Sequence, residues 1–163
     1  MKGTKAYFYV GALFVALVGT LFHFVYAWSG NNFFVGLVAP VNESVWEHTK
    51  LLFFPMLFYA LLRSKSRRVP AAAMICGELC GVLSMIVLFY TYSGIIGRDV
   101  DAVNIALFYL CVALAFFAAF KASKVCIPKK TAAILEAAQA ILIVLYFVFT
   151  YFPPRIALFA PPV

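Results

Sequence analysis

Long apolar runs, separated by only short polar stretches, constrain this chain more than any other feature. Of its residues, 66% are hydrophobic and only 12% are charged. A soluble domain of this composition would expose large apolar patches to water. We therefore expect an all-α integral membrane bundle, formed as a single domain over residues 1–163.

The apolar runs predict five transmembrane helices. Each run is long enough to cross the roughly 30 Å hydrocarbon core of a bilayer as a helix. A shorter apolar piece, Phe33 to Val41, precedes the second run and predicts a re-entrant or interfacial segment. The predicted spans cover residues 6–28, 44–62, 70–92, 102–120 and 131–152.

The distribution of Lys and Arg predicts the orientation of this bundle. With five spans, the N-terminus and the second and fourth connections share one side, and that side holds ten of the 13 basic residues. Short basic connections stay in the cytoplasm, so we expect a cytoplasmic N-terminus and an extracytoplasmic C-terminus, in the plasma membrane. The net charge of +7 is then explained by topology and contact with anionic lipid, not by nucleic acid. The ten are Lys2, Lys5, Arg63, Lys65, Arg67, Arg68, Lys121, Lys124, Lys129 and Lys130, and the other three are Lys50, Arg98 and Arg155.

The stretch "NESVWEH" concentrates polar chemistry at the outer start of the second span. Glu43 and Glu47 are four residues apart, which places them on one face of a helix, and His48 follows Glu47 directly. His23 is expected at the same depth on the first span, and Asp101 precedes the fourth. The pattern indicates a divalent-metal site at His23, Glu47 and His48, or an acid–base site at Glu43, Glu47, His48 and Asp101.

Helix capping offers a structural explanation for part of the same stretch. In a capping box, Ser44 accepts a hydrogen bond from the amide of residue 47 while the Glu47 carboxylate reaches back to Ser44. Asn42 is an alternative cap, and Trp46 suits a membrane interface. Capping does not account for His48, nor for His23 on the neighbouring helix, so the functional interpretation is favoured.

The third span contains Glu78, about two turns from its cytoplasmic end. A carboxyl group at this depth is either neutral or paired, so Glu78 is a possible proton or ion station or a neutral side chain bonded to another helix. Gly77 and Gly81 beside it form a small-xxx-small face that predicts close helix packing.

The segment "APVNESVWEHTKLLFFP" resembles the signature of a family of small bacterial integral membrane proteins of unknown function. In that family the residues Asn-Glu-Ser-Val-Trp-Glu-His, followed by Lys-Leu, mark the second helix; here they lie within Pro40 to Pro55. The segment "TYFPPRIALF", Thr150 to Phe159, is similar to the family's closing stretch. The resemblance implies a membrane fold and an important motif, and it implies no substrate.

Three functional classes remain open. The first is a membrane hydrolase or transferase that acts on a small-molecule or lipid-like substrate, with a divalent metal or with acid–base residues alone. The second is a proton- or ion-coupled carrier, with the outer cluster as its entry and Glu78 as a deeper station. The third is a haem-binding redox subunit with His23 and His48 as axial ligands. The sequence leaves the substrate and the oligomeric state open.

Overall fold

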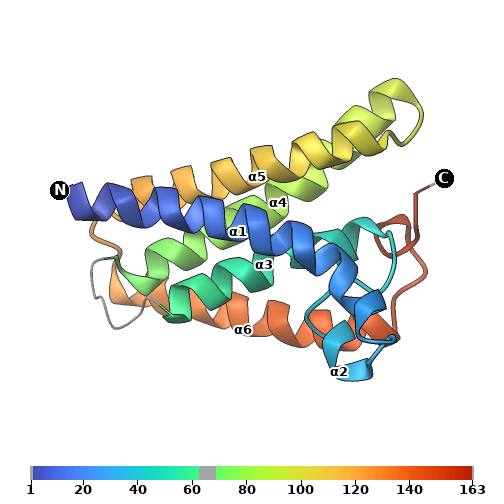
Figure 1. The fold of residues 1–163 in the computed structure, drawn as a ribbon. Coiled ribbons are helices and arrows are strands. Elements are labelled where there is room, and N and C mark those ends of the chain that lie inside the picture. Colours follow the sequence, from blue (N-terminus) through green and yellow to red (C-terminus); the bar gives the residue numbers. More distant parts are fainter. Residues whose placement is uncertain (1, 63–68, 163) are drawn as a thin grey trace.

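The computed structural model describes residues 2–62 and 69–162, with side chains from residue 5 onward. Within these ranges every regular element is a helix and there is no strand, which confirms the expected all-α fold (Figure 1). The elements are α1 (Lys2–Trp28), α2 (Phe33–Gly36), α3 (Val45–Leu62), α4 (Ala71–Ile96), α5 (Asp101–Ala122), α6 (Lys129–Tyr151) and a short 3-10 helix, η2 (Ala157–Phe159).

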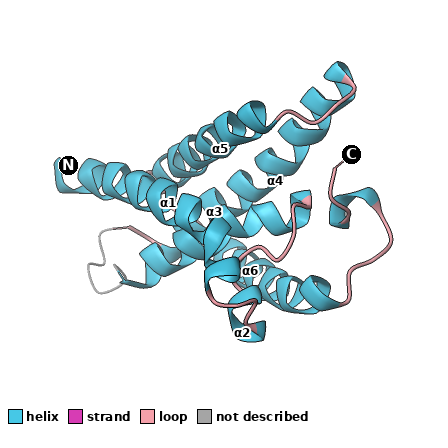
Figure 2. Ribbon diagram, turned by 45° about the vertical axis from the view of Figure 1, so that its right-hand side comes forward, coloured by secondary structure: helices cyan, strands magenta, loops and turns pink. Residues whose placement is uncertain are grey.

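The five long helices run along the length of the molecule with α3 at its centre (Figures 1 and 2). One end, which we call the α2 end, holds residues 29–44, residues 97–100 and the tail with η2. The opposite end holds the start of α1 and residues 123–128. Successive long helices therefore alternate in direction, as the five predicted spans require.

Four helices in the described part of the chain are long and apolar enough to cross a membrane: α1 from Lys5, α4, α5 and α6. The first turns of α3 carry Glu47, His48 and Lys50, which lower its hydropathy, so α3 is not among the four. Yet 12 of its 18 residues are buried, and it packs between α1 and α4. A helix that is apolar around most of its circumference is stable when other helices surround it.

Close packing of α4 against α5 depends on two glycines. A Cβ atom at Gly77 would collide with the carbonyl oxygen of Ala115 and with Ala119, and one at Gly81 would lie 2.8 Å from the Cβ atom of Ala115. The predicted small-xxx-small face is therefore confirmed as a helix-packing surface.

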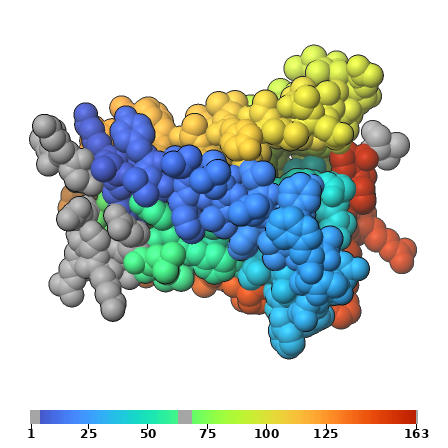
Figure 3. All heavy atoms as spheres, in the orientation of Figure 1, coloured from blue at the N-terminus to red at the C-terminus, as the bar shows by residue number. Residues whose placement is uncertain are grey.

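The helix ends differ most from the predicted span ends, by four residues in each case, at the start of α1 and at the end of α4. Helix α4 continues to Ile96, beyond the expected end at residue 92, because its chain reverses only at Gly97, which has a φ of 77°. The tip formed by α4 and α5 consequently stands away from the end of α1 (Figure 3). In the predicted segment from Phe33 to Val41 only α2 is helical, and Asn32 caps it through hydrogen bonds to its Oδ1.

The described basic residues divide between the two ends as expected. Lys5 and four lysines between residues 121 and 130 lie at the end opposite α2, whereas Arg98 and Arg155 lie at the α2 end. Lys50 also lies toward the α2 end, where its ammonium contacts the Gly36 carbonyl, but it is fully buried inside α3. Arg63, Lys65, Arg67 and Arg68 lie outside the described residues, as does the side chain of Lys2.

Candidate functional site

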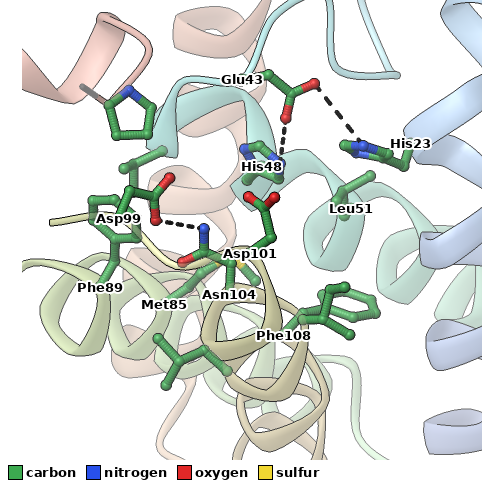
Figure 4. A pocket seen from close by; sticks show the side chains of 14 residues that line it. His23, Glu43, His48, Leu51, Met85, Phe89, Asp99, Asp101, Asn104 and Phe108 are labelled. Carbon is green, nitrogen blue, oxygen red and sulfur yellow. Dashed lines mark hydrogen bonds and ion pairs between the residues drawn. The ribbon is translucent and has the colours of Figure 1, made fainter. Parts of the chain in front are cut away.

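A cavity of about 600 Å³ lies at the α2 end, between the last turns of α1, the start of α3 and the α4–α5 tip. Figure 4 shows that polar side chains from three separate parts of the chain converge on it. The polar lining residues are His23, Glu43, His48, Asp99, Asp101 and Asn104, and the apolar ones include Leu51, Met85, Phe89, Ile105, Leu107 and Phe108.

Three potential metal ligands meet at this cavity. Glu43 lies between the two histidines: its Oε2 is 3.3 Å from His48 Nε2 and its Oε1 is 3.9 Å from His23 Nε2. The imidazole rings are 5.4 Å apart between centroids. One ligand atom from each residue lies within 4.8 Å of the other two, so a single ion can contact all three after small adjustments.

The start of α3 fixes the orientation of His48. Its Nδ1 lies 3.0 Å from the carbonyl oxygen of Ser44, one turn earlier. A carbonyl oxygen only accepts, so Nδ1 carries a proton, and Nε2 faces the Glu43 carboxylate. Histidine ligands of metals are commonly held by such a second hydrogen bond.

Two aspartates on the opposite wall have different surroundings. Burial alone would raise the pKa of Asp99, but hydrogen bonds from Tyr92, Asn104 and the Val100 amide, together with nearby His48, lower it below its ordinary value. Asp99 is therefore an ionised carboxylate that is held in place by these hydrogen bonds. Asp101, in the first turn of α5, forms no hydrogen bond or ion pair with the described residues, and its carboxylate points toward His48 (Figure 4).

Glu47 faces away from this cavity and forms a buried ion pair. Its Oε2 accepts hydrogen bonds from Lys50 Nζ at 2.7 Å and from the Val41 amide at 3.0 Å. Lys50 Nζ also donates to the Gly36 carbonyl at 2.9 Å and to Thr150 at 2.5 Å. The side chains of Lys50 and Glu47 are 0% and 2% exposed. Through the contacts of Lys50 with Gly36 and Thr150, this buried network connects α3 with α2 and α6.

Lys50 and Thr150 belong to this buried polar network, and the sequence interpretation did not include them among its candidate residues. A signal exists on α6, where Gln139, Tyr146 and Thr150 are spaced by seven and four residues and so share one face. The Tyr146 hydroxyl contacts Thr49 Oγ1 at 2.7 Å, which extends the polar contacts between α6 and α3.

The structure also shows the contacts of the predicted capping residues and of Trp46. Ser44 Oγ accepts from the Glu47 amide at 3.3 Å, as the capping box requires, but the Glu47 carboxylate does not return to Ser44. The amide of Ser44 instead donates to Asn42 Oδ1 at 2.9 Å. Trp46 is buried against Tyr146 and Phe159, with ring centroids at 4.7 and 5.1 Å.

Glu78 lines a second cavity, whose helical walls come from α1, α3, α4 and α6. It is 1% exposed, and Gln139 Nε2 donates a hydrogen bond to its Oε2. The structure thus brings together His23, Glu43 and His48, with Asp101 on the same cavity, and separates Glu47 and Glu78 from them.

Comparison with known proteins gives a family and no activity. A family model described as "Family of unknown function (DUF6512)" matches residues 1–163. No curated protein and no solved structure matches the chain.

Proposed function

The chain belongs to this family of unknown function, and we propose that it is a multi-pass membrane protein with a metal-dependent hydrolase site at its outer end. The proposed metal ligands are His23, Glu43 and His48, and the proposed substrate is a lipid-like ester. We further propose that α1, α3, α4, α5 and α6 all span the membrane with the N-terminus in the cytoplasm, so that the site would lie on the extracytoplasmic side.

One observation carries this proposal: three ligand atoms lie within 4.8 Å of one another beside a cavity whose remaining wall is largely apolar. Two imidazoles and one carboxylate leave coordination positions open, as in catalytic sites for zinc and similar ions. The apolar wall, which includes Met85, Phe89 and Phe108, suits an acyl chain.

Asp101 is the proposed general base. An ion held at the three ligands would polarise the ester carbonyl and make a bound water more acidic. Asp101 would take a proton from this water as the water oxygen bonds to the acyl carbon. The same proton would then pass to the leaving alcohol oxygen as the acyl carbon–oxygen bond breaks.

Metal binding is tested by Co²⁺ titration of the untagged protein in detergent micelles, followed by the visible absorption of the ion. We expect one ion per chain for the wild type and loss of the signal in His23→Ala and His48→Ala. Glu136→Gln, which alters an exposed carboxylate on α6, is the control and should bind normally. Co²⁺ binding that survives loss of both histidines would refute the site.

Hydrolysis is tested with 4-nitrophenyl esters of short and long acyl chains. We expect the metal-loaded protein to prefer the long chain, and Asp101→Asn to bind Co²⁺ yet lose about 100-fold or more in rate. A protein that binds the ion but cleaves none of the esters would retain the metal site and refute the hydrolase.

A further inference from the structure

We propose that the second cavity, at the end opposite α2, binds a lipophilic amine in its ammonium form, with Glu78 as the counter-ion. This inference is independent of the proposed outer metal site, because the two cavities share no lining residue.

The cavity is of a suitable size and largely apolar. It measures about 660 Å³, within the range of sites that enclose drug-sized molecules. Its walls come from α1, α3, α4 and α6, and they include Tyr7, Met56, Leu57, Met74 and Ile75. These side chains favour an apolar ligand body.

Glu78 gives this apolar cavity a single strong polar feature. Gln139 donates to Oε2, but Oε1 is buried and has no hydrogen-bond partner among the described residues. A buried oxygen without a partner is costly, and a carboxyl group buried this deeply ionises only when a cation pairs with it. The missing complement is therefore a group that supplies both an N–H donor and a positive charge.

An alkylammonium group meets both needs, and a neutral alcohol meets only one. The ammonium of a primary amine would donate to Oε1 while its charge compensates the carboxylate. Gln139 holds the other carboxylate oxygen, so the orientation of the acceptor is set before the ligand arrives.

The test compares 4-butylbenzylamine with its neutral analogue, 4-butylbenzyl alcohol. Binding is measured by equilibrium dialysis against the full-length protein in phosphatidylcholine nanodiscs, with empty nanodiscs subtracted. We expect saturable binding of one amine per chain, at least about tenfold weaker binding in Glu78→Gln, and little effect of that change on the alcohol. The matched control, Glu136→Gln, removes an exposed carboxylate from α6 and should bind the amine as the wild type does.

A second variant keeps the test decisive if Glu78→Gln fails to fold. Ala71→Phe adds bulk at an exposed position that lines the cavity, without altering the carboxyl group, and should also weaken amine binding. Equal affinity for amine and alcohol, wild-type affinity in either cavity variant, or an equal loss in Glu136→Gln would overturn the proposal.

Discussion

The buried pair of Lys50 and Glu47 shows how single residues fix the arrangement of this bundle. Lys50 Nζ donates to Glu47, Gly36 and Thr150, at 2.7, 2.9 and 2.5 Å. Such a pair is tolerated in a low-dielectric interior only when its polar atoms are satisfied. The contacts are made only when α2 and α6 occupy one position beside α3, so the pair favours this packing over alternatives.

Removal of one partner from this pair should be costly. Lys50→Met leaves the Glu47 carboxylate buried without its cation, and we expect a loss of about 3–5 kcal/mol in the free energy of unfolding. The double variant Glu47→Leu with Lys50→Met should recover much of this loss. The measurement is denaturant-induced unfolding in micelles, with Lys130→Met, at an exposed lysine, as the control. A single variant as stable as that control would show that the pair does not hold the bundle.

The positions of single residues also explain which parts of the site were predictable from the sequence. Helical spacing placed Glu43 and Glu47 on one face, but α3 begins only at Val45, so the spacing rule does not reach Glu43. Glu43 lies in the turn before α3 and points toward His23 and His48. Glu47 lies in the first turn of α3 and pairs with Lys50. Sequence located the polar residues, but it did not predict the contacts of Lys50 with Gly36, 14 residues away, and with Thr150, 100 residues away.

At the scale of helices, close approach of α4 and α5 gives a matched test within one helix. Gly77→Leu would force a side chain into the backbone of Ala115 and should destabilise the protein by about 1–3 kcal/mol or more. Gly94, also on α4, has no heavy atom within 4 Å of a Cβ position, so Gly94→Leu should be neutral or slightly stabilising. Thermal unfolding in micelles compares the two; equal stability would contradict a tight α4–α5 contact.

Helices were predictable where hydropathy alone decides them. The expected spans 102–120 and 131–152 agree with α5 (Asp101–Ala122) and α6 (Lys129–Tyr151) to within two residues at each end. The end of α4 was missed because the left-handed turn at Gly97 stops the helix, and hydropathy does not register such a turn. The polar face of α6 was also not predicted. The hydrogen-bond partners of Gln139, Tyr146 and Thr150 lie on α4 and α3, and the sequence of α6 does not identify them.

For the whole molecule, the two cavities give the two ends of the bundle different chemistry. The α2 end gathers two histidines and three carboxylates around one cavity, while the cavity at the opposite end has a single carboxylate behind apolar walls. Their roles depend on which end faces the cytoplasm. Orientation is therefore the property of the whole molecule that most affects both proposals.

The chain contains a native reporter for this orientation. Cys126 is exposed in the connection between α5 and α6, at the end opposite α2, whereas Arg98 is exposed beyond the tip of α4. With the proposed orientation, a membrane-impermeant maleimide should label Cys126 only after the cells are permeabilised. In a Cys126→Ser background, Arg98→Cys should be labelled on intact cells. The opposite pattern would invert the molecule and move the metal site to the cytoplasmic side, and labelling of both positions from one side would contradict a membrane-spanning α5, which separates them.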